Sequence, residues 1–75
     1  MSVKLTGSVS WMDDQGTYGR INYDLKTMMD GPAEFWPKDV ISGGPLKVGQ
    51  KVKFTHNKVQ DGGYYKNVAT EVEGL

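Results

Sequence analysis

The side chains of this 75-residue chain that could do chemistry are mainly aromatic and basic. Trp11, Tyr18 and Arg20 lie close together in the first third of the chain, and Trp36 follows near its middle. Flat aromatic rings stack on the bases of a nucleic-acid strand, and a guanidinium plane can stack on a base and also bind phosphate. These four residues are the first candidates for a binding surface. Further candidates are Phe35, Lys38, Tyr64 and Lys66, with Lys4 as another rim charge.

Residues suited to catalysis or metal binding are scarce. The chain has no cysteine and one histidine, His56, which continues an alternating apolar pattern and is expected to be half-buried and structural. The neighbouring acids Asp13 and Asp14, and the pair Asp24 and Asp30, fall in predicted turns, where aspartate hydrogen-bonds the backbone. We therefore expect no enzyme activity, no metal site and no cofactor.

Length and composition indicate a single folded domain spanning residues 1–75. Apolar residues make up 37% of the chain, and its two Trp, four Tyr and two Phe can supply a compact core. The net charge is zero, but residues 42–75 carry five lysines against three acids. These lysines could face an anionic ligand or simply keep the domain soluble. No apolar run is long enough for a secretory signal or a membrane span, so we expect a soluble cytoplasmic protein without a membrane partner.

Alternating apolar and polar residues predict an all-β fold. No window carries a helical period for long enough to predict a stable helix. Strands are predicted at residues 4–12, 18–23, 33–36, 51–58 and 64–72, and a single helical or 3₁₀ turn within residues 38–42. Glycine-rich turns separate them. Five strands in so short a chain favour a small closed barrel over an open sheet with unpaired edges.

The same alternation assigns side chains to the two faces of each strand. In residues 18–23, Tyr18 and Arg20 should share the outer face, and the odd-numbered residues should face inward. In residues 51–58, Val52, Phe54 and His56 should share the inner face, and Lys53, Thr55 and Asn57 the outer one. Trp11 lies two residues after Val9, so strict alternation would bury both. An exposed Trp11 requires a bulge or a strong strand twist.

The third strand allows two registers. In one, Phe35 faces outward as a stacking ring, and Glu34 and Trp36 point inward. In the other, Ala33 and Phe35 fill the core, and Glu34 and Trp36 face outward. Burying an unpaired carboxylate costs several kcal/mol, so we expect the second register. Phe35 is a binding candidate only in the first.

Two features leave alternatives open. Tyr64, next to Gly62 and Gly63, could extend the stacking surface or pack against a cross-strand neighbour. Leu25, Met28 and Met29 lie in a connection that is usually polar. They could fold back over one end of the barrel or present an adaptable apolar contact to a protein partner.

The order of these motifs resembles that of the cold-shock domain family. The first strand ends at Trp11, a polar turn follows, and the next strand opens with the string Tyr-Gly-Arg-Ile at residues 18–21. The string Pro-Leu-Lys-Val-Gly-Gln-Lys-Val-Lys-Phe at residues 45–54 and Lys-Asn-Val at residues 66–68 are similar to later family segments. The departures are the loss of the basic residue of the second-strand family motif, Arg20 in place of its second aromatic and, in the expected register, Trp36 in place of a histidine.

The resemblance implies a five-stranded antiparallel OB-type barrel. It also implies binding of single-stranded RNA or DNA with low sequence specificity, as an RNA chaperone or a modulator of transcription or translation. The alternative is a divergent OB-fold module that binds a protein partner and has weak or no affinity for nucleic acid. Neutral net charge, the missing family aromatics and the Met28–Met29 pair favour the alternative. Trp11, Tyr18 and Arg20 favour nucleic acid.

Overall fold

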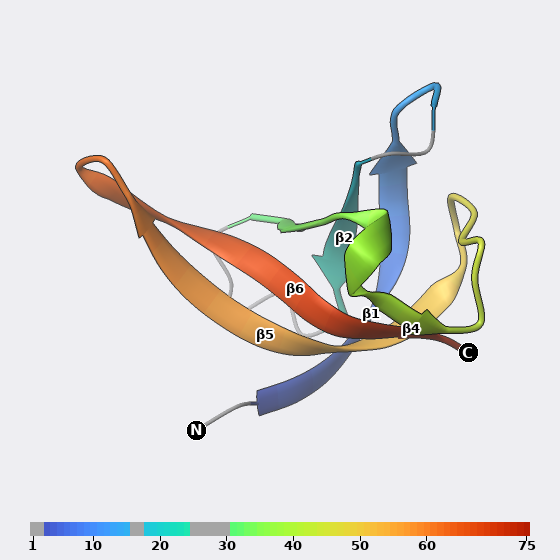
Figure 1. The fold of residues 1–75 in the computed structure, drawn as a ribbon. Helices are drawn as coiled ribbons and strands as arrows, with labels where there is room; N and C mark the ends of the chain where they lie inside the picture. The colour runs from blue at the N-terminus through green and yellow to red at the C-terminus, as the bar shows by residue number, and fades with distance from the viewer. Residues whose placement is uncertain (1–2, 16–17, 25–30) are drawn as a thin grey trace.

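The described part of the chain consists mainly of β-strands (Figure 1). The computed structural model describes residues 3–15, 18–24 and 31–75. Their elements are β1 (Val3–Met12), β2 (Gly19–Tyr23), β3 (Ala33–Phe35), the 3₁₀ helix η2 (Pro37–Asp39), β4 (Val40–Ser42), β5 (Lys51–Asp61) and β6 (Tyr64–Gly74). Within these ranges, no helix has the length and apolar character needed to cross a membrane.

Five of the strands close into a barrel, which confirms the predicted all-β, OB-type architecture. β1 pairs antiparallel with β2 and β5, β2 with β3, and β5 with β6. A parallel pairing of β3 with β6, at Glu34 and Val68, closes the ring. β4 adds a sixth strand along β6, also in parallel. The barrel is therefore antiparallel except where it closes.

Alternation in β2 and β3 sets the inside and the outside of the barrel. Ile21 and Tyr23 are buried and Arg20 is exposed, as predicted for β2. In β3, Phe35 is 1% exposed and Ala33 is fully buried, so the second of the two predicted registers is confirmed. The core comprises Val9, Ile21, Tyr23, Ala33, Phe35, Leu46, Val52, Phe54, Ala69 and Val72.

A glycine makes room for the largest ring on this side of the core. Gly19 pairs with Phe35 across β2 and β3. A Cβ atom added to Gly19 would lie 2.6 Å from Cε1 of Phe35. Because that distance is far inside van der Waals contact, the Phe35 ring can pack over this position only if no side chain is present there.

A β-bulge in β1 exposes Trp11. Val9 pairs with Ile21, but Trp11 pairs with Arg20, so Ser10 is an extra residue in β1. The Ser10 hydroxyl donates a hydrogen bond to the Arg20 carbonyl oxygen at 3.3 Å. The extra residue changes the parity of the strand, so Val9 is buried while Trp11 is 45% exposed. This is the bulge that an exposed Trp11 requires.

β5 and β6 form a long hairpin whose tip projects beyond the rest of the barrel (Figure 1). The prediction that Thr55 faces outward was wrong, because its residue is only 2% exposed. The pairing shifts between Lys53 and Thr55, where β6 contributes an extra residue and Glu71 adopts a φ of 50°. Such an irregularity bends the strand that carries it and increases the local twist, and Thr55 lies next to it.

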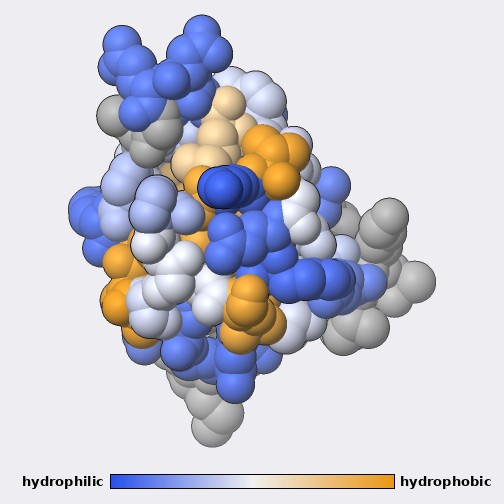
Figure 2. Space-filling model, turned by 90° about the vertical axis from the view of Figure 1, so that its right-hand side faces the viewer, coloured by the Kyte–Doolittle hydropathy of each residue, from blue (hydrophilic) through white to orange (hydrophobic). Residues whose placement is uncertain are grey.

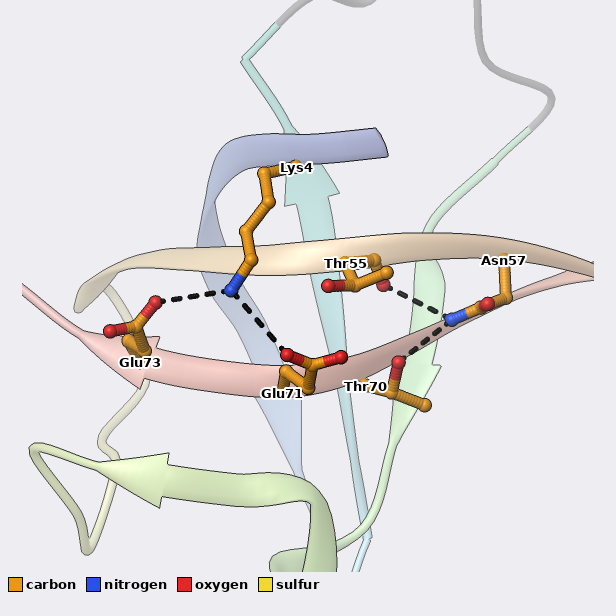
Figure 3. Close-up of polar contacts among 6 residues, drawn as sticks. All are labelled: Lys4, Thr55, Asn57, Thr70, Glu71 and Glu73. Atoms are coloured by element: carbon orange, nitrogen blue, oxygen red, sulfur yellow. Dashed lines mark hydrogen bonds and ion pairs between the residues drawn. The ribbon is translucent and has the colours of Figure 1, made fainter. Parts of the chain in front are cut away.

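Side-chain contacts brace the hairpin at this shift (Figure 3). The Asn57 amide donates hydrogen bonds to the Thr55 carbonyl oxygen at 3.3 Å and to Oγ1 of Thr70 at 2.9 Å. On the other side, the Lys4 ammonium lies 3.8 Å from Glu71 and 3.4 Å from Glu73. These contacts connect β1, β5 and β6 where the backbone pairing is irregular.

β4 was absent from the predicted strands. The turn predicted within residues 38–42 divides into the 3₁₀ helix η2 and the three-residue strand β4. So short a strand shows no alternation in sequence, and its pairing partner lies some thirty residues further along the chain in β6.

Leu25, Met28 and Met29, the candidates for contact with a protein partner, lie outside the described residues. Hydrophobic residues also remain on the surface, and Figure 2 shows one face where they form small patches among hydrophilic ones.

Replacing Phe35 with alanine should destabilise the barrel. The substitution leaves a cavity in a fully packed interior, which costs about 3–5 kcal/mol in the free energy of unfolding. Lys38→Ala, three residues later and exposed, is the control and should change that free energy by less than about 0.5 kcal/mol. Urea denaturation followed by circular dichroism measures both. Equal stabilities for the two variants would contradict the assigned inner face of β3.

Stability should fall at alkaline pH because of Tyr23. Burial raises the pKa of its hydroxyl from 10.0 to about 12, and this hydroxyl lies 2.9 Å from Nδ1 of His56. The folded state holds the proton more tightly than the unfolded chain, so this stabilisation is complete below pH 10 and is lost as the pH rises towards 12. Between these values the Tm should fall more steeply for the wild type than for Tyr23→Phe. Parallel curves would show that burial does not protect this proton.

Candidate nucleic-acid interface

Three aromatic rings form a row on the outer surface of the barrel. Trp11, at the end of β1, lies edge-on to Tyr18, with ring centroids 5.7 Å apart and an interplanar angle of 70°. Tyr18 in turn lies 5.4 Å from Trp36, at an angle of 55°. Trp11 is exposed and the other two rings are half-buried. Side chains from three separate parts of the sequence therefore form one continuous aromatic surface, which we call the aromatic row.

The local backbone explains the position of Tyr18 in the middle of this row. The hairpin between β1 and β2 closes with a hydrogen bond from the Asp13 amide to the Tyr18 carbonyl oxygen at 3.0 Å. The Tyr18 amide donates in return to Oδ1 of Asp13 at 3.2 Å. The aspartate thus serves the backbone of the turn, as its position in the sequence predicts.

Arg20 borders the aromatic row because of the bulge in β1. It pairs directly with Trp11 across the strands, and its Cζ lies 5.7 Å from the centroid of the Trp11 ring. A side-chain hydrogen bond with Tyr18 raises the pKa of Arg20, and the charge of Glu34 adds a smaller contribution. The guanidinium therefore remains charged and lies close to the aromatic surface, where a base or a phosphate could contact it.

Glu34 joins the aromatic row to the basic side chains of β6. The Tyr18 hydroxyl donates a hydrogen bond to Oε1 of Glu34 at 2.7 Å. The Lys66 ammonium lies 3.4 Å from Oε2 of Glu34 and 3.5 Å from Oδ2 of Asp61. The attraction of Glu34, with a smaller contribution from Asp61, raises the pKa of Lys66. The Glu34 carboxylate, which was expected to face outward, therefore has two partners on the outer surface, Tyr18 and Lys66.

A hollow of about 520 Å³ continues this surface towards the β5–β6 hairpin. At the hairpin, Tyr64 and Tyr65 are 65% and 62% exposed, and the Lys58 ammonium lies 5.8 Å from the centroid of the Tyr65 ring. The hollow therefore combines two exposed rings, cations and one carboxylate. It is lined by Arg20, Pro32, Glu34, Lys58, Tyr64, Tyr65, Lys66 and Asn67.

Most of the candidate residues from the sequence meet on this surface. Two of the other candidates are placed elsewhere. Phe35 was wrong as a candidate for this face, because it fills the core and is only 1% exposed. Lys4 is paired with Glu71 and Glu73 on the irregular part of the hairpin (Figure 3). The structure brings together Trp11, Tyr18, Arg20, Trp36, Tyr64 and Lys66.

Lys38 is exposed in η2, two residues after Trp36. Among the described residues its ammonium makes no hydrogen bond or ion pair. Its ammonium is therefore available to a ligand that reaches η2.

Glu34 and four other residues that line the hollow were not among the binding candidates from the sequence. Lys58 and Tyr65 come from opposite strands of the β5–β6 hairpin, and Asn67 pairs directly with Lys58. Pairing the residues outward from the turn at Asp61–Gly62–Gly63 would have indicated this neighbourhood. Pro32 enters only because β3 closes the barrel against β6, and no local signal in the sequence indicates that contact.

The described residues include no group of three or more His, Cys, Asp or Glu side chains able to hold a metal ion. The surface offers aromatic planes, hydrogen-bond donors and acceptors, and fixed cations. Such groups bind and orient a ligand by stacking and by charge.

Comparisons with known proteins add no family assignment to this geometry. No protein-family model matches the chain, and neither does any curated protein. The case for a function therefore depends on the aromatic row, the hollow and the charges that lie between them.

Proposed function

We propose that this chain binds single-stranded RNA or DNA by stacking bases on its aromatic and basic face. The binding has low sequence specificity along most of the strand, because every base has a flat face that a ring can contact. The role that follows is that of an RNA chaperone or a modulator of transcription or translation in the cytoplasm, as in the cold-shock family that the sequence resembles. The proposed role is binding alone, without a catalytic step.

The observation that carries this proposal is the aromatic row with Arg20 beside it. Trp11 is a large ring that the β1 bulge turns towards solvent, and the residue stays 45% exposed although burial of apolar surface stabilises a fold. Its exposure next to two further rings and a guanidinium is unusual for a surface that only meets water. Successive bases that stack on such rings gain about 1–3 kcal/mol each.

The charges on this face predict modest electrostatic attraction. Lys66 is already paired with Glu34 and Asp61, so a phosphate must compete with two carboxylates for it. Arg20 and Lys58 lie next to rings of this face, and Lys38 is exposed two residues after Trp36. Binding should therefore depend on stacking more than is usual, and fewer counterions should be released than from a strongly basic protein.

A short oligo-U or oligo-dT should quench the intrinsic tryptophan fluorescence. The chain has two tryptophans, and both lie in the aromatic row, so a base that stacks there changes the signal of every tryptophan. Titration at increasing salt should give a falling affinity with a shallow slope, because few free cations are present.

The control for this titration is a duplex of the same length, whose bases are already stacked and cannot reach the rings. It should quench much less than the single strand. If neither quenching nor a mobility shift occurs with any single strand at tens of micromolar protein, the nucleic-acid proposal is wrong. The protein-binding alternative would then be favoured.

Replacing Arg20 with alanine should weaken binding without unfolding the barrel. The variant loses one cation next to Trp11, so the affinity should fall severalfold and the salt slope should decrease by about one. Lys4→Ala is the matched control, because it also removes one exposed cation, but one that is held by Glu71 and Glu73. Its affinity should stay close to that of the wild type. Equal losses in both variants would indicate unspecific attraction and not binding at the aromatic row.

A further inference from the structure

Glu34 is an unusual residue to find in the middle of a surface for an anionic ligand. It lies on β3 between Arg20 of β2 and Val68 of β6, and its side chain is 24% exposed. A carboxylate there repels phosphates and weakens the attraction of Lys66 for them. Its position is better explained by contact with a part of the nucleic acid that carries hydrogen-bond donors, which are found on the bases.

Both oxygens of Glu34 are held in place, and both keep acceptor capacity. The Tyr18 hydroxyl bonds Oε1 at 2.7 Å, and the Lys66 ammonium lies 3.4 Å from Oε2. A carboxylate can accept about four hydrogen bonds, two on each oxygen. One site on each oxygen therefore remains free of these two partners, and the side chain lines the hollow. A carboxylate that is fixed in this way is suited to a ligand that offers two parallel N–H donors.

We propose that the hollow beside Glu34 is a guanine-selective subsite within an otherwise sequence-tolerant binding face. Among the four standard bases, only guanine carries two adjacent N–H donors on its pairing edge, N1–H and the N2 amino group, and these match the two oxygens of a carboxylate. Uracil and thymine offer one N–H between two carbonyl oxygens, which the carboxylate repels. This inference rests on the proposed function, and it adds to it the identity of one preferred base.

The rest of the hollow supplies what a bound nucleotide needs besides its pairing edge. The exposed rings of Tyr64 and Tyr65 line the same space as Glu34 and offer planes for stacking. Arg20 and Lys58 line it as well and can neutralise the flanking phosphates. Single-stranded bases are recognised in this way, by stacking on an aromatic ring together with hydrogen bonds to the exposed pairing edge.

The test compares U-rich RNA decamers that differ at one central position, which carries guanine, inosine, adenine or uracil. Inosine keeps N1–H and lacks the N2 amino group, so it removes one of the two proposed hydrogen bonds. The guanine decamer should bind at least about fivefold more tightly than the adenine and uracil decamers, and inosine should fall between them. In Glu34→Gln the amide group presents its own N–H donors to the base, so the guanine preference should largely disappear.

Asp61→Asn is the matched control. It also removes one carboxylate that is paired with Lys66, but Asp61 does not line the hollow. Both variants should gain affinity for the adenine and uracil decamers through charge, and only Glu34→Gln should lose the guanine preference. Equal binding of all four decamers, or a guanine preference that survives in Glu34→Gln, would overturn the inference and leave the stacking proposal intact. Failure of every decamer to bind would refute the proposed function itself.

Discussion

The packing of Phe35 against Gly19 is the contact on which the arrangement of the surface depends. Burial of this ring fixes the register of β3 against β2. Because side chains alternate along a strand, the same register turns Glu34 and Trp36 outward. Shifting β3 by one residue would bury a carboxylate and expose a core ring. The interior of the barrel thus determines which groups its outer face presents.

The bulge at Ser10 has a comparable effect on the other side of that face. Without the extra residue, Trp11 would share the inward parity of Val9, and the aromatic row would lose one end. With it, Trp11 pairs with Arg20 and lies next to Tyr18. β-Bulges near binding surfaces commonly redirect one side chain in this way. The extra residue interrupts the regular pairing of β1 with β2 at this point, where the Ser10 hydroxyl donates a hydrogen bond to the Arg20 carbonyl oxygen.

The charges of the face are balanced within the fold. Glu34 accepts a hydrogen bond from Tyr18 and attracts Lys66, while Asp61 attracts the same lysine from the hairpin. These ion pairs are partly open to solvent and contribute little to stability. Their larger effect is to position side chains, because Glu34 connects a ring of the aromatic row with a cation of β6. Although the chain has no net charge, these contacts give the face a defined arrangement of hydrogen-bond donors and acceptors.

Much of the fold could be predicted from local patterns. Alternation and glycine-rich turns indicated the five barrel strands, and the cost of burying Glu34 selected the correct register of β3. The predictions failed where pairing is irregular or distant. Thr55 is buried next to a register shift between β5 and β6, and β4 is too short to show a period. The hollow depends on β3 meeting β6, which sequence proximity does not indicate.

The sequence by itself determined the all-β class, the inner and outer faces of β2 and the aromatic and basic character of the candidate surface. Those properties follow from side-chain size, polarity and the two-residue period of a strand, all of which are local. Only the tertiary structure decided that Glu34 meets both Tyr18 and Lys66, and that Tyr64 and Tyr65 line the hollow with Arg20. These neighbours come from different strands. Closure of the barrel between β3 and β6 is what brings them together.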